Sequence, residues 1–332
     1  MESNVKGPGT EADDTDKESS KLPSVKTDGP SYRIKVNLSV EEDPYPQNRS
    51  IYYNSIVIAG GSVKGFAFLG VLQYLQDKYM LRKVTRYYGT SIGSSIAYLL
   101  SIGYTPTEIM ILLITERVLE KIHDISPLNC VNGKGAVSMQ PLLNFLEKIT
   151  IKKIGYCPTF EHIYRRYSKF LTIVTHNLTT GDTEYMNPET HPDMSCITAI
   201  RMSCSIPLVF ETYKYKDAFY TDGCITDPFP IERAITEDSG KIFGVTFDYN
   251  KTIPSGPEPD SLSILELFQR ILPDILNSRG RKFENLPRRC AVINLKFDNH
   301  QDNMIKFDMT IANQLGMFSE GYQKAREFYE KD

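Results

Sequence analysis

Long apolar runs are missing from this chain of 332 residues. A helix needs roughly 20 consecutive apolar residues to cross a bilayer, and the longest runs here are short stretches such as residues 109–114. The first residues are acidic and polar, with no apolar core after a basic start, so they do not resemble a secretory signal. We therefore expect a cytoplasmic protein without a spanning helix.

An excess of positive charge is missing as well. The chain has 38 Lys and Arg against 41 Asp and Glu, a net charge of -3, and a pI of about 6.0. Phosphate backbones are usually bound by strongly basic domains, so nucleic acid is not an expected partner. Hydrophobic residues make up 41% and charged residues 24%, which are globular values and exclude a wholly disordered chain.

Metal-binding motifs are also absent. The six cysteines are widely spaced, with no Cys-x-x-Cys and no pair of histidines at the spacing of zinc ligands. Free thiols in a reducing compartment are the simplest interpretation. We expect neither a metal nor a cofactor.

Composition divides the chain into three parts. Residues 1–30 hold too few apolar side chains to offset the entropy lost on folding, so they are expected to form a disordered acidic and polar tail. Residues 31–50 combine a short alternating strand at 32–40 with a linker that contains two prolines. Residues 51–332 carry the patterns of a folded domain.

Within that domain, strand patterns alternate with helix patterns, which argues for an α/β layer fold. Thr105 to Glu108 and Ser263 to Glu266 form capping boxes that open two helices, the first running to about Lys121. The expected strands are residues 56–59, 84–88, 171–175, 219–221, 242–247 and 291–295. Further expected helices are residues 94–101, 140–148 and 193–202, one that includes Phe68 to Tyr79, and a closing helix that includes Ile311 to Ala325.

The sharpest motif is Gly89-Thr90-Ser91-Ile92-Gly93, which has the form G-x-S-x-G and lies between an expected strand and an expected helix. In this context the serine occupies a strained turn that points its hydroxyl out of the sheet. Gly89 and Gly93 let strand and helix pack closely, and the helix N-terminus adds positive potential. The pattern alone is weak, because a chance glycine–serine turn also produces it.

A glycine-rich loop, Gly60-Gly61-Ser62-Val63-Lys64-Gly65, follows the first expected strand. Its backbone amides can hold an anion. A P-loop would need Ser or Thr after the lysine, and a dinucleotide loop would need an acidic residue at the end of the next strand, but neither is present. The loop and the serine turn follow successive strands, which favours an oxyanion hole over a plain tight turn.

A third motif, Thr221-Asp222-Gly223, follows a short expected strand. Asp222 is a candidate general base, although Asp-Gly most often forms a plain turn. Asp227, just before Pro228, is its main competitor. A Ser-Asp-His triad in α/β-hydrolase order would need a histidine after the acid, and only His300 qualifies, in a polar stretch typical of a surface loop.

Together these three motifs resemble those of the patatin-like phospholipase family. Residues 175–181, Thr-His-Asn-Leu-Thr-Thr-Gly, and residues 202–210, Met-Ser-Cys-Ser-Ile-Pro-Leu-Val-Phe, are also similar to family segments. No single motif is decisive, but their order and spacing over roughly residues 55–330 are specific. The resemblance implies a three-layer α/β fold for residues 51–332, with a mostly parallel central sheet flanked by helices.

The resemblance also implies a Ser–Asp dyad without histidine. On this analogy Ser91 is the nucleophile, Asp222 is the general base, and the loop from Gly60 to Gly65 supplies the oxyanion hole. A free Asp has a pKa of about 3.9 and is a poor base for a serine hydroxyl. The oxyanion hole must therefore supply much of the barrier reduction, since the loss of one donor typically costs about 2.7–4 kcal/mol.

The implied substrate is a phospholipid, hydrolysed without calcium during transient peripheral contact with a membrane, with or without a protein activator. The alternatives are a neutral-lipid or thioester acyl hydrolase on the same dyad, or a catalytically silent lipid-binding or interaction protein. Two departures from the family motivate the silent protein. Ser62 stands where members usually have a third glycine, and Cys224 stands where they have Gly or Ala.

Two segments are candidates for the membrane contact. One is a local basic cluster, which faces either anionic lipid or, more simply, solvent. The other is the helix at residues 262–276, whose apolar stripe suits either a membrane interface or core packing. The basic cluster consists of Arg279, Arg281, Lys282, Arg288 and Arg289.

Overall fold

The structure is a computed structural model that describes residues 51–122, 135–247, 264–280, 286–296, 307 and 309–330. The expected tail at residues 1–30 and the expected strand and linker at residues 31–50 lie outside this part. His300 and the capping serine Ser263 lie outside it too.

Eight strands in the described residues form one mixed sheet in the order β5-β6-β3-β2-β1-β7-β8, with β4 paired to β3. The parallel strands are β1 (Ser55–Ile58), β2 (Arg86–Thr90), β3 (Phe170–Asn177), β7 (Ile242–Phe247) and β8 (Cys290–Leu295). The antiparallel strands are β4 (Thr183–Met186), β5 (Tyr213–Tyr215) and β6 (Ala218–Asp222). All residues of β1 and β7 are buried, as is typical of central parallel strands covered on both faces.

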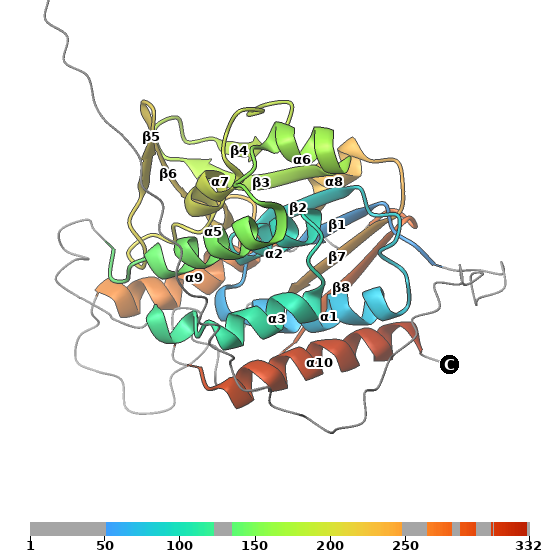
Figure 1. The fold of residues 1–332 in the computed structure, drawn as a ribbon. Coiled ribbons are helices and arrows are strands. Elements are labelled where there is room, and N and C mark those ends of the chain that lie inside the picture. Colours follow the sequence, from blue (N-terminus) through green and yellow to red (C-terminus); the bar gives the residue numbers. More distant parts are fainter. Residues whose placement is uncertain are drawn as a thin grey trace, which may run out of the picture. The chain divides into compact units, whose positions relative to one another are not determined.

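Helices flank this sheet, which confirms the expected architecture (Figure 1). In Figure 1, α1, α3 and α10 lie together on one side of it, with α10 outermost. The α-helices are α1 (Gly65–Asp77), α2 (Ile92–Ser101), α3 (Pro106–Thr115), α5 (Gln140–Ile154), α6 (Phe160–Tyr167), α7 (Cys196–Ser203), α8 (Ile231–Glu237), α9 (Ile264–Gly280) and α10 (Ile311–Tyr329). Short 3-10 helices are η1 (Ser62–Lys64), η2 (Leu119–Lys121) and η3 (Gly223–Ile225).

Glycines allow α1 and α10 to approach closely. A Cβ added to Gly70 would lie 1.9 Å from the carbonyl oxygen of Phe318. A Cβ added to Gly321 would lie 2.0 Å from the carbonyl oxygen of Ala67. Both distances are far below van der Waals contact, so a side chain at either position would force the helices apart.

Local signals predicted the helix start at Thr105 better than its end. Thr105 Oγ1 accepts the Glu108 amide, and the Glu108 carboxylate accepts the Thr105 amide at 2.7 Å, so the capping box is confirmed. The helix ends at Thr115 rather than near Lys121, because the backbone of Arg117 turns to a φ of +50°. Four short elements were not expected, namely α6, α8, β4 and β5, whose lengths of three to eight residues leave little periodicity to detect.

Among the described residues, no single helix is long and apolar enough to cross a membrane. Taken together, α2 and α3 have the length and composition of a membrane span, but they are bent by 119° at the break between them. In α2, the side chains of Ile96, Ala97 and Tyr98 lie in the core.

Candidate active site

The register of the sheet brings the three motifs together. β1 and β2 are parallel neighbours with Ile58 opposite Gly89, so the glycine-rich loop and the serine turn leave the same edge of the sheet. On the other side of β2, Thr90 pairs with Val174 of β3. The next residue of β3, Thr175, pairs with Asp222 of β6. Residues far apart in the sequence therefore meet at the carboxyl ends of β1 and β2.

Ser91 occupies a sharp turn between β2 and α2. Its φ is +54°, in the left-handed region, and its side chain is buried. A Cβ on Gly89 would lie 2.5 Å from the carbonyl oxygen of Gly93, and one on Gly93 would lie 2.3 Å from that of Ile58. Both glycines of the G-x-S-x-G motif are thus required by the close approach of strand and helix, which is the context that the pattern needs.

Ser91 and Asp222 are joined by a buried hydrogen bond. Ser91 Oγ donates to Asp222 Oδ2 at 2.6 Å, and the Cys224 amide donates to Asp222 Oδ1 at 2.8 Å. The carboxyl is 1% exposed, and this burial raises the pKa of Asp222 to about 6, although the two hydrogen bonds act in the opposite direction. Asp222 is therefore a much stronger base at neutral pH than a free Asp.

Ser203, which sequence reasoning did not single out, supports this turn. Its hydroxyl accepts the Ser91 amide at 2.9 Å and donates to the Val174 carbonyl at 2.6 Å. The same segment also holds the strand that carries the base, because the Ser205 carbonyl accepts the Asp222 amide at 3.0 Å. Ser203 lies in the family-like segment 202–210, but one serine among many carries no local mark of such a role.

The glycine-rich loop contributes less than expected to the pocket beside Ser91. Of its six residues, only Gly61 and Ser62 line that pocket. The Gly60 amide donates to the Pro228 carbonyl at 2.9 Å, so the expectation that Gly60 supplies an oxyanion donor is wrong. A Cβ on Gly60 would lie 2.1 Å from Cys224 Sγ, which shows how tightly this loop packs against the segment after Asp222.

The other three loop residues pack away from the pocket. Lys64 is buried, with its ammonium 5.1 Å from the centre of the Phe247 ring. Val63 is buried as well. Gly65 opens α1 against Ile92, whose Cγ1 would lie 2.9 Å from an added Cβ. These residues fix the position of the loop and do not face the space next to Ser91.

The pocket is small and mostly apolar. Its volume is about 10 Å³, the space of roughly one water molecule. Leu272 and Leu276 of α9 cover it and are almost fully buried. Its lining residues are Gly61, Ser62, Ser91, Ile206, Pro207, Asp222, Cys224, Ile225, Leu272 and Leu276.

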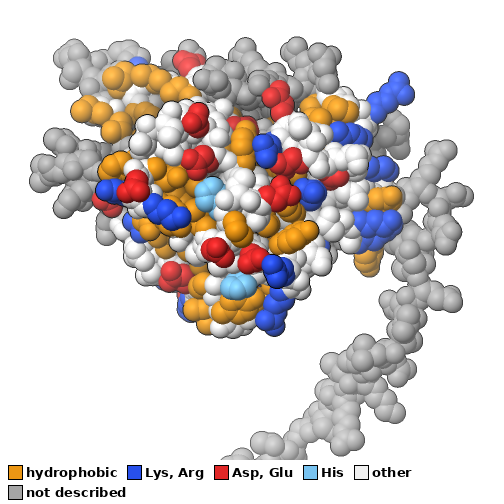
Figure 2. Space-filling view, turned by 90° about the horizontal axis from the view of Figure 1, so that it is seen from above, with side chains coloured by type: hydrophobic (Ala, Val, Ile, Leu, Met, Phe, Trp, Pro, Cys, Tyr) orange, Lys and Arg blue, Asp and Glu red, His pale blue; other side chains and the backbone are white. Residues whose placement is uncertain are grey.

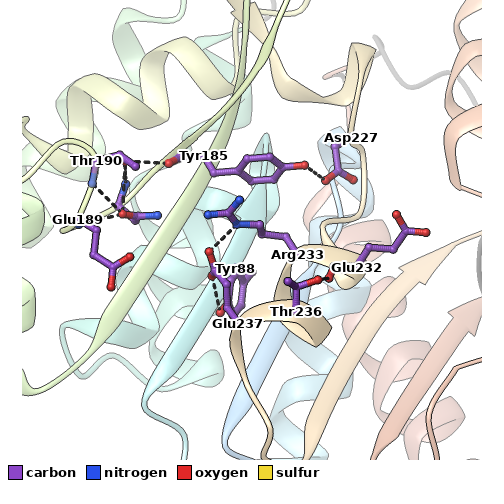
Figure 3. Close-up of polar contacts among 10 residues, drawn as sticks. Tyr88, Tyr185, Glu189, Thr190, Asp227, Glu232, Arg233, Thr236 and Glu237 are labelled. Carbon is purple, nitrogen blue, oxygen red and sulfur yellow. Dashed lines mark hydrogen bonds and ion pairs between the residues drawn. The ribbon is translucent and has the colours of Figure 1, made fainter.

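Asp227, the competing acid, belongs to a different set of contacts (Figure 3). Its Oδ2 accepts the Tyr185 hydroxyl at 2.8 Å, and its carbonyl accepts the Thr90 hydroxyl at 3.0 Å. The Arg233 guanidinium lies 4.8 Å from the centre of the Tyr185 ring and donates to Glu237. The structure therefore brings Asp222, and not Asp227, to Ser91.

Neither the histidines nor the basic cluster contribute to this pocket within the described residues. His162, His176 and His191 are described, and none of them lines it. The Arg289 guanidinium donates to the carbonyls of Ile235 in α8 and of Asp238 and Gly240 just after it. The expectation that Arg289 faces lipid or solvent is therefore wrong. Arg288 is exposed, and the other three side chains of the cluster lie outside the described part.

Comparisons with known proteins identify the family. The family model for patatin-like phospholipase matches residues 56–235. A probable lipid hydrolase of Invertebrate iridescent virus 6 is 34% identical over 187 residues, which are 55% of this chain and 64% of that protein. The uncharacterized protein YqhO of Bacillus subtilis is 32% identical over 209 residues, which are 57% of this chain and 69% of that protein.

Solved structures show a more distant likeness. VipD from Legionella pneumophila is 15% identical with a TM-score of 0.46, covering 83% of this chain and 66% of VipD. The type III effector ExoU is 16% identical with a TM-score of 0.44, covering 82% of this chain and 52% of ExoU. This chain thus spans less than two thirds of the viral lipid hydrolase and about half of ExoU.

Proposed function

Because this chain belongs to the patatin-like phospholipase family, we propose that it is a lipid acyl hydrolase of the phospholipase A type. The observation that carries the proposal is the buried hydrogen bond of 2.6 Å from Ser91 Oγ to Asp222 Oδ2. It joins a hydroxyl on a strained turn to a carboxylate whose pKa burial raises to about 6. A nucleophile within hydrogen-bond reach of its base is the arrangement that acyl transfer requires.

In the acylation step, Ser91 Oγ attacks the ester carbonyl carbon while its proton passes to Asp222 Oδ2. The carbonyl oxygen becomes an oxyanion, which we assign to the main-chain amides of Gly61 and Ser62 and to the positive N-terminus of α2. When the tetrahedral intermediate collapses, the leaving alkoxide takes the proton from Asp222. The lysophospholipid departs and the fatty acyl group remains on Ser91.

In the deacylation step, Asp222 takes a proton from a water molecule that attacks the acyl carbon. A second tetrahedral intermediate forms at the same donors and then collapses, with the proton returning to Ser91 Oγ as the fatty acid leaves. Since the Cys224 amide also donates to the carboxylate, Asp222 keeps its orientation through both steps. The proposed chemistry uses no metal and no cofactor, so calcium is not required.

Access to the pocket supports a reaction at a membrane surface. A cavity of about 10 Å³ cannot hold an acyl chain, so Leu272 and Leu276 of α9 must move aside before a lipid enters. The same helix exposes Ile264 by 65%, Leu267 by 47% and Ile271 by 44%, at spacings of three and four residues. We propose that this exposed stripe of α9 inserts into the bilayer surface, so that membrane contact and opening of the pocket occur together.

The face drawn in Figure 2 shows acidic and basic side chains interspersed among apolar ones. On this face charge of neither sign predominates. The whole chain carries a net charge of -3, which gives little long-range attraction to anionic lipid. We therefore propose that contact with the membrane depends on apolar insertion more than on charge.

The test is mass spectrometry of the products formed from mixed phospholipid vesicles in calcium chelator. Wild-type protein should release fatty acid and lysophospholipid in equal amounts, and Ser91→Ala and Asp222→Asn should release neither. Fatty acid without lysophospholipid, from added triacylglycerol or thioester, would support the neutral-lipid or thioester alternative. If nothing is released and a fluorophosphonate probe does not label Ser91, the protein is a silent binding protein and the proposal fails.

A further inference from the structure

Ser62 stands out among the residues beside Ser91, because its backbone conformation is unfavourable for the residue it is. Its φ is +51°, in the left-handed region, which glycine adopts far more readily than a residue with a Cβ does. The chain therefore keeps a side chain where a glycine would relieve strain.

The hydroxyl of Ser62 adds a second unfavourable feature. Its Oγ is buried and has no hydrogen-bond partner among the described residues. A buried hydroxyl without a partner is destabilising, because it has lost its bonds to water and gained none in return. A glycine, or an alanine, would avoid this second cost as well. Such a group is best explained when its partner belongs to a bound state.

The surroundings of Ser62 indicate what that partner is. Ser62 lines the same space of about 10 Å³ as Ser91 and Asp222. Asp222 already accepts hydrogen bonds from the Ser91 hydroxyl and the Cys224 amide. Five of the other lining residues are apolar: Ile206, Pro207, Ile225, Leu272 and Leu276. Besides the nucleophile, Ser62 is the lining residue that brings a hydroxyl donor to the space where the ester carbonyl meets Ser91.

We propose that the Ser62 hydroxyl is a side-chain donor of the oxyanion hole, an inference that rests on the proposed acyl hydrolysis. As the bond from Ser91 Oγ to the carbonyl carbon forms, the electron pair of the C=O bond moves onto oxygen, and the Ser91 proton moves to Asp222. Ser62 Oγ–H donates to that oxygen without giving up its proton. The bond strengthens as negative charge develops and weakens when the C=O bond reforms, so it stabilises the transition state more than the bound ester.

This assignment changes what the departure from the family means. Replacement of glycine by Ser62 could crowd the loop and silence the enzyme. In the structure, Ser62 instead lines the same pocket as the nucleophile, and its hydroxyl has no other partner among the described residues. The Gly60 amide is bonded to Pro228, so the loop has one main-chain donor fewer than expected. The Ser62 hydroxyl takes the place of that missing donor.

The test compares Ser62→Ala and Ser62→Gly in the full-length protein, with p-nitrophenyl butyrate as substrate and a fluorophosphonate as an active-site probe. Alanine keeps the Cβ and the backbone strain, whereas glycine removes both, so the two variants share only the loss of the hydroxyl. The matched control is Ser101→Ala, a buried serine on α2 whose hydroxyl bonds the Tyr98 carbonyl. Thermal unfolding verifies that each variant is folded.

Both Ser62 variants should lose at least about tenfold in kcat, toward the 10²–10³-fold known for a single oxyanion donor, with KM within about threefold of wild type. Labelling by the fluorophosphonate, whose phosphoryl oxygen occupies the oxyanion position, should slow in parallel, while Ser101→Ala behaves as wild type. If either Ser62 variant retains kcat within threefold, or if KM alone rises, Ser62 is not an oxyanion donor. If wild type hydrolyses the ester no faster than Ser91→Ala, the proposed function itself fails, and this inference with it.

Discussion

Replacing Asp222 with Asn should abolish ester hydrolysis and, at the same time, stabilise the protein at alkaline pH. The side chain is 1% exposed, and burial raises its pKa from 3.8 to about 6. Because the folded state binds this proton more tightly than the unfolded state, ionisation of Asp222 destabilises the fold as pH rises. Asparagine has nearly the same shape, can accept the Cys224 amide and can donate to Ser91 Oγ, but it never carries the charge.

The magnitude follows from the two pKa values. Their difference corresponds to about 3 kcal/mol, at 1.36 kcal/mol per pKa unit, which is the full destabilisation above pH 6. At pH 4 the carboxyl is protonated in the folded state and only about half ionised in the unfolded state, so the destabilisation is below about 1 kcal/mol. The stability gained by Asp222→Asn should therefore grow by roughly 2 to 3 kcal/mol between pH 4 and pH 8.

Urea unfolding of wild type and variant at pH 4, 6 and 8 measures this difference, and Asp227→Asn serves as the control acid. The kcat/KM of the wild type should rise with pH and level off above an apparent pKa near 6, since the base must be ionised to accept the Ser91 proton. A stability gain that is the same at pH 4 and pH 8 would refute a raised pKa for Asp222. A rate without an inflection near pH 6 would refute its role as the base.

Three further substitutions test the support of the site and its surface. Ser203→Ala removes the acceptor of the Ser91 amide and should lower kcat about tenfold or more without changing the circular dichroism spectrum, whereas an unchanged rate would show that the turn holds without it. Gly60→Ala should lower Tm by several degrees, because the added Cβ meets Cys224 Sγ. The double variant with Cys224→Ala should recover most of that loss in Tm, and no recovery would contradict the clash. Leu267→Asp should weaken co-sedimentation with vesicles about tenfold or more, since burial of one leucine contributes roughly 1.5–3 kcal/mol, while hydrolysis of a water-soluble ester stays unchanged. If Leu267→Asp sediments with vesicles as well as wild type does, a surface other than α9 makes the membrane contact.

The sequence alone determined the alternation of strands and helices and the nature of the turn at Ser91. These are local properties: β-branched runs, amphipathic spacing and a capping box act over a few residues, and glycines two positions either side of Ser91 mark a strand and helix that nearly touch. Short elements were not predicted, because they offer too few residues for such local patterns. The eight residues of α6 bury only Phe160 and Ile163, which is too little periodicity to predict a helix.

Only the tertiary structure decided how Asp222 reaches Ser91. The sequence and its family resemblance already favoured Asp222 over Asp227, but β3 lies between the strands of Ser91 and Asp222, and its register places those two side chains together across 131 residues of chain. The raised pKa of Asp222 likewise results from burial. The bond of the Gly60 amide to Pro228 and the lack of a partner for the Ser62 hydroxyl also depend on tertiary neighbours. Sequence patterns report what neighbours in the chain can form, whereas desolvation and hydrogen-bond partners depend on neighbours that only the assembled sheet brings near.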